Sequence, residues 1–288
     1  MADEVLEGPE GPAPGEGPAA DAPVLAVFAH PDDAEISAGG TLTRWATEGR
    51  AVHLLILTNG DRGSEDPNED RAALAHTRLQ ESEAAARSMG LAGVRILRVH
   101  DGELENSHRV RVDIAREVRR RRPQTVVTCD PTAWFFGNQY FNHSDHRKAG
   151  EAALDAVFPG AGNPLFFQEL LQEGLEPWKV KEVWLGWTNE PNQFQDVTGF
   201  MERKLSALGD HASQVKGGCS DSSRNGFRWR LRRTARRSAS STQKGSGFSR
   251  SNELRLELPI LDVRADNRSA LRKEPPWPIQ TRRSFATG

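Results

Sequence analysis

The sequence predicts an α/β protein built on a Rossmann-like, mainly parallel sheet with helices on both faces. Two observations lead to this fold class. Short apolar runs of the kind that form buried strands alternate with longer stretches whose apolar residues recur at helical spacing. The 288-residue chain, of which 36% is apolar, is also long enough to bury one sizeable core. Strands that alternate with helices form βαβ units, whose strands run parallel and whose crossovers are right-handed.

Five apolar runs are expected to form strands. The first, 23–29, reads PVLAVFA, and the second, 51–58, reads AVHLLILT. Three further runs follow at 94–99, 124–130 and 179–187. Ligands of such sheets bind beyond the carboxyl ends of the strands, so functional residues are expected in the loops that begin there.

Each expected strand is followed by a stretch that predicts a helix. These stretches cover 34–49, 70–89, 108–122, 144–158 and 196–208. In the third of them, Val110, Ile114 and Val118 recur at every fourth position, which places them on one helical face. Gly49 and Gly90 stand where the first two helices should stop.

Polar residues with metal-binding side chains follow the first and fourth strands. In HPDDAE, His30 and Asp33 lie three residues apart where a strand gives way to a helix, and in HSDH, His143 and His146 lie three apart around Asp145. This spacing points the two side chains of each pair the same way. Zinc takes imidazole nitrogen and carboxylate oxygen, and a catalytic zinc has three protein ligands and an open position for water. The two clusters together predict a metal site, with other residues left for general base and oxyanion stabiliser.

Each cluster by itself has a simpler explanation. HPDD could be a turn followed by a helix N-cap, since Asp caps helices well. HSDH could be a Ser or Asp cap with two solvated histidines. The prediction therefore depends on the two clusters occurring together, each at the end of an expected strand.

The motifs AHPDDAE, GGTL, TNGDRG and HSDHR resemble those of the LmbE/PIG-L family of zinc-dependent de-N-acetylases. That family includes N-acetylglucosaminyl-phosphatidylinositol deacetylase, the deacetylases of the mycothiol and bacillithiol pathways, and mycothiol S-conjugate amidase. The resemblance runs from about residue 23 to about 218 and includes HASQV at 211–215. It implies an LmbE-like fold.

The resemblance also implies a role for each residue of the two clusters. It implies three zinc ligands: His30, Asp33 and His146. Asp32 would be the general base that deprotonates the attacking water. His143 would be protonated and would stabilise the oxyanion, and Asp145 would hold His143 and raise its pKa. Ferrous iron would fit the same ligands nearly as well as zinc in a reducing cytoplasm.

Substrate contacts follow from the same resemblance. The sugar-binding arginine of the family, in an Arg-x-x-Glu helix, matches Arg78 with Glu81, and a carboxylate for a sugar hydroxyl matches Asp101. An i,i+3 surface pair and a turn residue are the ordinary alternatives for these positions. Some relatives have a tyrosine two residues before the catalytic histidine; here Phe141 stands there and Tyr140 is one further back.

Composition divides the chain into three parts. Residues 1–22 are rich in Pro, Gly, Ala and acids and are expected to form a disordered leader, and 23–215 to form the deacetylase domain. Residues 1–215 contain 21 Lys and Arg against 34 Asp and Glu, whereas 216–288 contain 17 against 6. We expect the Arg- and Ser-rich tail to be disordered. It could be a basic arm, but the abrupt end of the family resemblance favours a frameshifted reading frame.

Three further features bear on location and partners. No apolar run approaches 18 residues, the N-terminus lacks the features of a secretory signal, and Cys129 and Cys219 give no disulfide framework, so a cytoplasmic protein is expected. The basic run 116–123 favours a solvated helix end over a nucleic-acid contact. The aromatic run 134–141 could be either a pocket wall that stacks on a sugar or a core plug.

The function expected from the sequence is that of a zinc-dependent hydrolase. It would remove the N-acetyl group from an N-acetylglucosamine-type conjugate and give acetate and a free amine. The alternatives are an amidase acting on a thiol-sugar S-conjugate, or a product without activity because of its aberrant tail. The expected partner is a small N-acetylated amino sugar, with a homo-oligomer as a further option.

Overall fold

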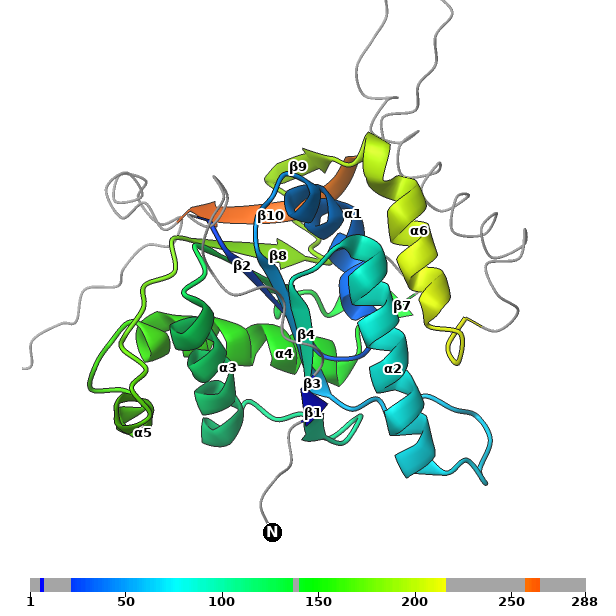
Figure 1. The fold of residues 1–288 in the computed structure, drawn as a ribbon, viewed down its shortest axis with the longest axis horizontal. Helices are drawn as coiled ribbons and strands as arrows, with labels where there is room; N and C mark the ends of the chain where they lie inside the picture. Colours follow the sequence, from blue (N-terminus) through cyan, green and yellow to red (C-terminus); the bar gives the residue numbers. More distant parts are fainter. Residues whose placement is uncertain (1–5, 8–21, 137–139, 216–256, 265–288) are drawn as a thin grey trace, which may run out of the picture.

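The computed structural model describes residues 6–7, 22–136, 140–215 and 257–264, and these form a mixed sheet with helices on both faces (Figure 1). Five parallel strands make up the centre in the order β4, β3, β2, β5 and β8. They are β4 (Gly93–Val99), β3 (Val52–Thr58), β2 (Val24–Phe28), β5 (Thr125–Cys129) and β8 (Glu182–Gly186). This confirms the predicted fold class and all five predicted strands.

Antiparallel strands extend the sheet on both sides. At one edge β1 (Leu6–Glu7) pairs with β4. Beyond β8, β10 (Glu257–Arg264) and then β9 (Gln193–Asp196) follow. The sequence predicts no regular element at β10. The rest of the predicted tail, and almost all of the predicted leader, lie outside the described residues.

Helices cover the two faces of the sheet in two groups. α1 (Asp33–Thr47), α2 (Arg71–Met89) and α6 (Met201–Asp210) pack together on one face, and α3 (His108–Arg121) and α4 (Ser144–Asp155) on the other (Figure 1). Strand β2 serves both cores because its side chains alternate. Leu25 and Val27 face α3 and α4, whereas Val24, Ala26 and Phe28 face α1 and α2. All five are buried, so β2 is the centre of the protein.

The ends of α2 follow from its terminal residues. At the start, the Asp70 side chain accepts hydrogen bonds from the backbone N–H groups of Ala72 and Ala73, at 2.9 and 3.1 Å. At the end, Gly90 adopts the left-handed conformation, with φ of 75°, and its N–H bonds back into the last turn. The predicted helix 70–89 is therefore confirmed to within one residue.

Two predicted helices differ from those observed. The predicted helix 144–158 ends as an α-helix at Asp155 and continues as a π-helical segment, Ala156–Ala161. Inside that segment Phe158 has φ −137° and ψ 125°, because the residue before a proline is driven out of the helical region. The predicted helix 196–208 begins instead at Met201, after β9 and a 3₁₀ turn. Besides β1 and β9, the short elements that were not predicted are β6 (Phe135–Phe136), β7 (Tyr140–Phe141) and α5 (Gln168–Gln172).

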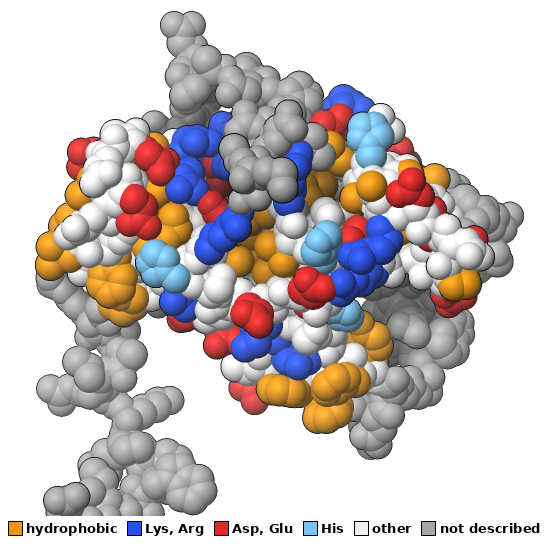
Figure 2. All heavy atoms as spheres, turned by 90° about the horizontal axis from the view of Figure 1, so that it is seen from below, with side chains coloured by type: hydrophobic (Ala, Val, Ile, Leu, Met, Phe, Trp, Pro, Cys, Tyr) orange, Lys and Arg blue, Asp and Glu red, His pale blue; other side chains and the backbone are white. Residues whose placement is uncertain are grey.

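Three arginines of the basic run at the end of α3 pair with carboxylates, whereas Arg119 is buried and donates to backbone carbonyls, so the expected solvated helix end does not include it. Arg120 and Arg121 contact the buried carboxylate of Glu117 at 3.0 and 3.4 Å, and Arg116 reaches Glu173 at 2.8 Å. On the face drawn in Figure 2, Lys and Arg side chains are likewise mixed with Asp and Glu. Among the described helices, none is long and apolar enough to cross a bilayer.

The strand order places the functional loops together. After β4 the chain crosses over the sheet and returns as β5 on the other side of β2, so the order of the strands reverses between β2 and β5. In doubly wound sheets the ligand binds beyond the carboxyl ends of the strands at this switch point. The loop after β2 begins with His30, and the loop after β5 leads to α4 and His146.

Candidate metal-dependent active site

Three side chains converge at the switch point. His30 follows β2, Asp33 is the first residue of α1, and His146 lies in the first turn of α4. His30 Nδ1 lies 3.2 Å from His146 Nε2 and 3.4 Å from Asp33 Oδ2, and His146 Nε2 lies 3.2 Å from Asp33 Oδ1. All three residues are buried.

These distances fit the ligand set of a tetrahedral metal. Zinc binds His nitrogen and carboxylate oxygen at about 2.0–2.1 Å, which sets neighbouring ligand atoms about 3.3 Å apart. The separations of His146 Nε2 from His30 Nδ1 and from Asp33 Oδ1 lie within about 0.2 Å of that value, and the other Asp33 oxygen, Oδ2, lies 3.4 Å from His30 Nδ1. His30, Asp33 and His146 therefore match a site with three protein ligands, in which a fourth position is left for water or substrate.

Two carboxylates beside the other ring nitrogen of His30, Nε2, fix the tautomer of this histidine. His30 Nε2 lies 3.1 Å from Asp101 Oδ1 and 3.2 Å from Asp145 Oδ2. A carboxylate partner holds the proton on Nε2, so the lone pair on Nδ1 faces Asp33 and His146. Burial lowers the pKa of His30, but the carboxylates of Asp33, Asp101 and Asp145 outweigh it and raise that pKa to about 12. So much negative charge around one imidazole favours a bound cation.

His146 is oriented by residues that the sequence analysis missed. Asn142 Oδ1 lies 2.9 Å from His146 Nδ1, and Asn142 Nδ2 donates to the carbonyl of Ala133 at 2.7 Å. The second bond fixes which way the amide points, so His146 donates from Nδ1 and presents Nε2 to the metal position. The ring of Trp187 packs on His146 with centroids 4.6 Å apart, and Trp187 has a positive φ of 54°. Such backbone strain often accompanies functional sites.

Two other groups of candidate ligand atoms surround His30. Nitrogen atoms of His30, His143 and His146 lie within 4.8 Å of one another, and so do ligand atoms of His30, Asp101 and Asp145. The second group is on the Nε2 side, where the proton is. In the first, His143 Nδ1 accepts the backbone N–H of Asp145 at 3.2 Å, so this nitrogen does not point a free lone pair at the site.

The roles implied for His143 and Asp145 differ from what the structure shows. The Asp145 carboxylate accepts the N–H of Gly102 at 2.7 Å and contacts His30, rather than the ring of His143. Burial, and after it the charge of His30, lowers the pKa of His143, although Asp145 favours its protonated form. His30 and His143 are neighbours, with ring centroids 4.8 Å apart, so a positive charge on either imidazole disfavours protonation of the other.

Asp32 lies beside the metal position in a strained backbone conformation. It precedes α1 with φ of 97°, in the left-handed region that residues other than glycine rarely adopt. Burial, and next to it the charge of Asp33, raise the pKa of Asp32 to about 7, although Arg78 opposes the shift. A carboxylate with a pKa near neutrality suits a general base.

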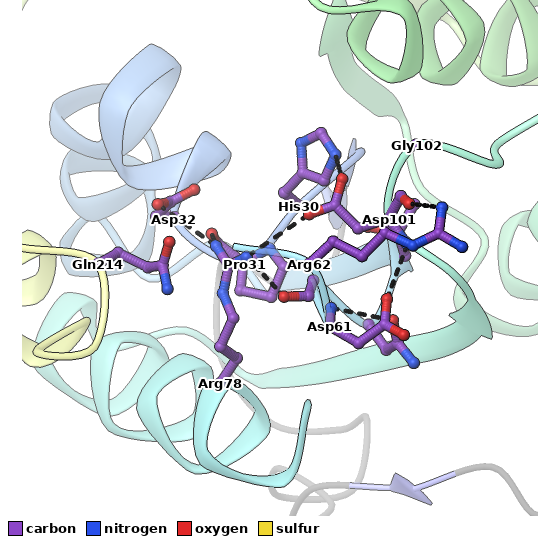
Figure 3. A network of polar contacts seen from close by, with 12 residues as sticks. His30, Pro31, Asp32, Asp61, Arg62, Arg78, Asp101, Gly102 and Gln214 are labelled. Atoms are coloured by element: carbon purple, nitrogen blue, oxygen red, sulfur yellow. Dashed lines mark hydrogen bonds and ion pairs between the residues drawn. The ribbon is translucent and has the colours of Figure 1, made fainter. Parts of the chain in front are cut away.

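Arg78 connects the loops around the site from below (Figure 3). Its guanidinium is 3% exposed and donates to the carbonyls of Pro31 at 2.7 Å and Gly60 at 3.0 Å. Asp32 Oδ2 is 3.5 Å away and Asp101 Oδ2 is 3.9 Å away. The geometry is that of a residue that positions two loops and two carboxylates.

Its helix neighbour Glu81 is buried and accepts from the N–H and hydroxyl of Ser213 at 2.6 and 2.7 Å. The HASQV segment is thereby held against α2, and Gln214 extends toward Arg78 (Figure 3). The alternative of a surface i,i+3 pair for Arg78 and Glu81 is wrong, because both side chains are buried.

All eight residues singled out in the sequence meet at this place. They are His30, Asp32, Asp33, Arg78, Asp101, His143, Asp145 and His146. Asp61 was missed, although it holds the Asp101 loop by accepting the N–H of Asp101 at 3.1 Å. Its place in TNGDRG, after β3, is the only signal that could have indicated it.

Comparisons with known proteins agree with this geometry. The family model PIG-L, GlcNAc-PI de-N-acetylase, matches residues 25–157. Diacetylchitobiose deacetylase of Thermococcus kodakarensis is 37% identical over 191 residues, which cover 66% of this chain and 69% of the relative. A probable N-acetyl-alpha-D-glucosaminyl L-malate deacetylase 2 of Bacillus cereus is 29% identical over 67% of this chain and 84% of the relative.

A solved structure shares the fold. N,N'-diacetylchitobiose deacetylase from Pyrococcus horikoshii, complexed with an inhibitor, superimposes with a TM-score of 0.70 at 28% identity, over 84% of this chain and 83% of that one. The family model covers the segment that carries both metal-binding motifs, and the Thermococcus relative is matched over more than two thirds of its length. The chain belongs to the PIG-L family of de-N-acetylases.

Proposed function

We propose that this chain is a metal-dependent deacetylase of N-acetylglucosamine conjugates. It would hydrolyse the acetamide C–N bond and release acetate and a free amine. The observation that carries the proposal is the convergence of His30 Nδ1, His146 Nε2 and the Asp33 carboxylate at metal-ligand spacing. The substrate class is supported by the names of the relatives, which act on diacetylchitobiose and, in the Bacillus protein, on an N-acetylglucosaminyl malate.

The metal that we propose is zinc, and ferrous iron suits the same donors. Two imidazoles, one carboxylate and an open position are the ligand pattern of catalytic zinc. When bound, such an ion polarises the amide carbonyl and lowers the pKa of the attacking water. His30, Asp33 and His146 would hold it, and Asp101, Asp145 and Asn142 would keep the two imidazoles oriented.

The chain supplies the proton transfers. Asp32 would take a proton from the attacking water and pass it to the leaving amine. His143 Nδ1 accepts a backbone N–H, so its proton is on Nε2, and we assign Nε2–H as the donor that stabilises the oxyanion of the tetrahedral intermediate. Asp101, with its side chain 14% exposed, is proposed as the carboxylate that meets a sugar hydroxyl. Arg78 would act on the sugar through the two loops that it holds.

The direct test is release of free amine from N-acetylglucosamine and from N,N'-diacetylchitobiose by the zinc-loaded full chain. Asp32→Asn is the critical variant, because Asn tolerates the left-handed backbone that Asp32 adopts. We expect it to keep the metal and to lower kcat by about 10²–10⁴-fold. Asp155→Asn, which changes an exposed carboxylate at the other end of α4, is the matched control and should be fully active. Equal activity of the Asp32 variant would contradict the mechanism.

One cysteine bears on the compartment in which the enzyme acts. Cys129 is a free, buried thiol, which agrees with a reducing compartment, and we infer that the enzyme acts in the cytoplasm.

A further inference from the structure

The hairpin formed by β6 and β7 exposes a group of large aromatic side chains. Trp134 is 52% exposed, Phe135 60%, Tyr140 51% and Phe141 58%. A core plug would bury these rings, so that interpretation of the aromatic run is wrong. Soluble proteins rarely expose several large aromatic rings in one place, and such patches often mark a binding surface. We call Trp134, Phe135 and Phe141 the aromatic platform.

Hydrogen bonds join the platform to the metal ligand His146. The N–H of Asn142 donates to the carbonyl of Trp134 at 2.9 Å, and the side chain of Asn142 bridges Ala133 and His146. On the other side, Asn189 Nδ2 donates to the carbonyl of Phe135 at 2.9 Å. Asn142 therefore both holds the platform near the active site and orients the proposed metal ligand His146.

The loop after β8 adds a second link. It carries Asn189, which holds the hairpin, and Trp187, whose ring packs on His146 at 4.6 Å. The loop after β8 therefore contacts both the hairpin, through Asn189, and the ring of His146, through Trp187. Two separate links, through Asn142 and through Trp187, thus connect the hairpin region to His146.

The platform rings are packed against one another with a cation behind them. Phe141 lies 5.4 Å from Phe135 and 6.4 Å from Trp134, measured between centroids. The guanidinium of Arg147, next to His146 in α4, lies 3.8 Å from the centre of the Trp134 ring. One face of the indole is covered by Arg147, and the side chain is still half exposed, so the other face is open to a ligand.

We propose that the aromatic platform binds the second pyranose ring of an N-acetylglucosamine disaccharide whose first ring presents its acetamide at the metal site. This inference rests on the proposed function and adds a substrate preference to it. A pyranose ring has a face of C–H groups, which packs on an aromatic face, and a rim of hydroxyls that needs polar partners. Arg147 and Asn189 beside the rings supply such partners. An alkyl chain would instead be bound in an enclosed apolar channel, whereas these rings are more than half exposed.

The test compares two substrates in the zinc-loaded full chain. We expect kcat/KM for N,N'-diacetylchitobiose, divided by kcat/KM for N-acetylglucosamine, to fall about tenfold in Trp134→Ala and in Phe141→Ala, through KM for the disaccharide. Trp134→Phe keeps a ring and should restore most of this preference. Phe158→Ala removes a side chain that is 81% exposed at the far end of α4 and is the matched control, with an unchanged ratio. An unchanged ratio in both platform variants would overturn the proposal and leave the deacetylase intact.

Binding separates this inference from the proposed function. In the Asp32→Asn background, calorimetry measures the affinity for N,N'-diacetylchitobiose relative to N-acetylglucosamine without turnover. If the wild-type chain releases no amine but Trp134→Ala still removes a disaccharide preference, the platform stands and the deacetylase proposal fails. If the disaccharide binds no better than the monosaccharide, the platform proposal is wrong. A lower molecular mass of Trp134→Ala in light scattering would also overturn it, because the rings would then join two copies of the chain.

Discussion

Glu35 Oε1 lies 3.5 Å from His211 Nε2, and the two residues are 1% and 0% exposed. Within the described part of the chain neither ring nitrogen of His211 and neither carboxylate oxygen of Glu35 has a hydrogen-bond partner. Burial lowers the pKa of His211, but Glu35 outweighs it and the pKa is raised. The pair joins the first turn of α1, beside the proposed metal ligand Asp33, to the segment that follows α6.

We expect this buried pair to couple strongly. Glu35→Gln and His211→Gln should each lower the free energy of unfolding by about 3–5 kcal/mol, because each removes the contacting partner of a buried ionisable group. The double variant should be less destabilised than the sum of the two, by about 1–3 kcal/mol. Urea unfolding of the wild type, the two single variants and the double variant completes this double-mutant cycle. The exposed pair Lys148 and Glu151 is the control, with a coupling of about 0.3–0.5 kcal/mol; additive effects at the buried pair would contradict the prediction.

Asn142 is predicted to raise the affinity of the site for zinc without being a ligand itself. Asn142→Ala removes the acceptor that holds the proton on His146 Nδ1, so the affinity for zinc should fall about 10–100-fold. Chelator competition measures this affinity directly and needs no substrate. Asn68→Ala changes an exposed loop residue and should leave the affinity as it is. Zinc affinity that is the same in both variants would mean that His146 is oriented by its packing on Trp187 alone.

Two glycines form a matched pair for testing the contact between Arg78 and the loop after β3. Gly60 has φ of 63° and Gly174 has φ of 75°, so alanine meets the same backbone penalty of about 1 kcal/mol at both. At Gly60 a Cβ would also lie 2.4 Å from Arg78 Nη1, whereas at Gly174 it would meet nothing within 4 Å. We expect Gly60→Ala to lose deacetylase activity and several °C more in Tm than Gly174→Ala. Equal effects in thermal unfolding and in amine release would show that Arg78 moves aside freely.

His53 on β3 predicts a specific sensitivity to acid. Burial, and then the charge of Arg121, lower the pKa of His53 to about 4 from an ordinary value near 6.5. Between these values the unfolded chain binds a proton that the folded chain does not, so the free energy of unfolding falls as the pH falls from 6.5 to 4. The loss amounts to about 2 kcal/mol at pH 5.

His53→Gln should therefore lose less stability than the wild type between pH 7.5 and pH 5, and urea unfolding at both values measures the difference. Other acid-labile groups, the metal ligands included, act alike in both proteins. His76→Gln, a change at an exposed residue of α2, should follow the wild type. If His53→Gln loses as much stability as the wild type between these pH values, then His53 is protonated in the folded state at pH 5.

The sequence predicted the central sheet well because its strands are buried on both faces. The run 24–28 is apolar at every position, and the helices that follow β3 and β4 begin at capping side chains, Asp70 and Ser107. The elements that were not predicted are either short or paired with distant parts of the chain. The hairpin of β6 and β7 has two residues in each strand, and β10 pairs with strands far away in the chain, so neither has a local pattern to recognise.

The sequence by itself determined which side chains we propose to carry the chemistry of this protein. The spacing of His30 with Asp33, and of His143 with His146, at two strand ends is a local property that periodicity and motif can identify. The tertiary structure decided which atoms of these side chains face the proposed metal position. The proton on His30 Nε2 and the orientation of His146 depend on Asp101, Asp145 and Asn142, whose contacts span long stretches of sequence or depend on the hairpin fold. Hydrogen bonds and the fields of buried charges act through space, and only the folded chain sets those distances.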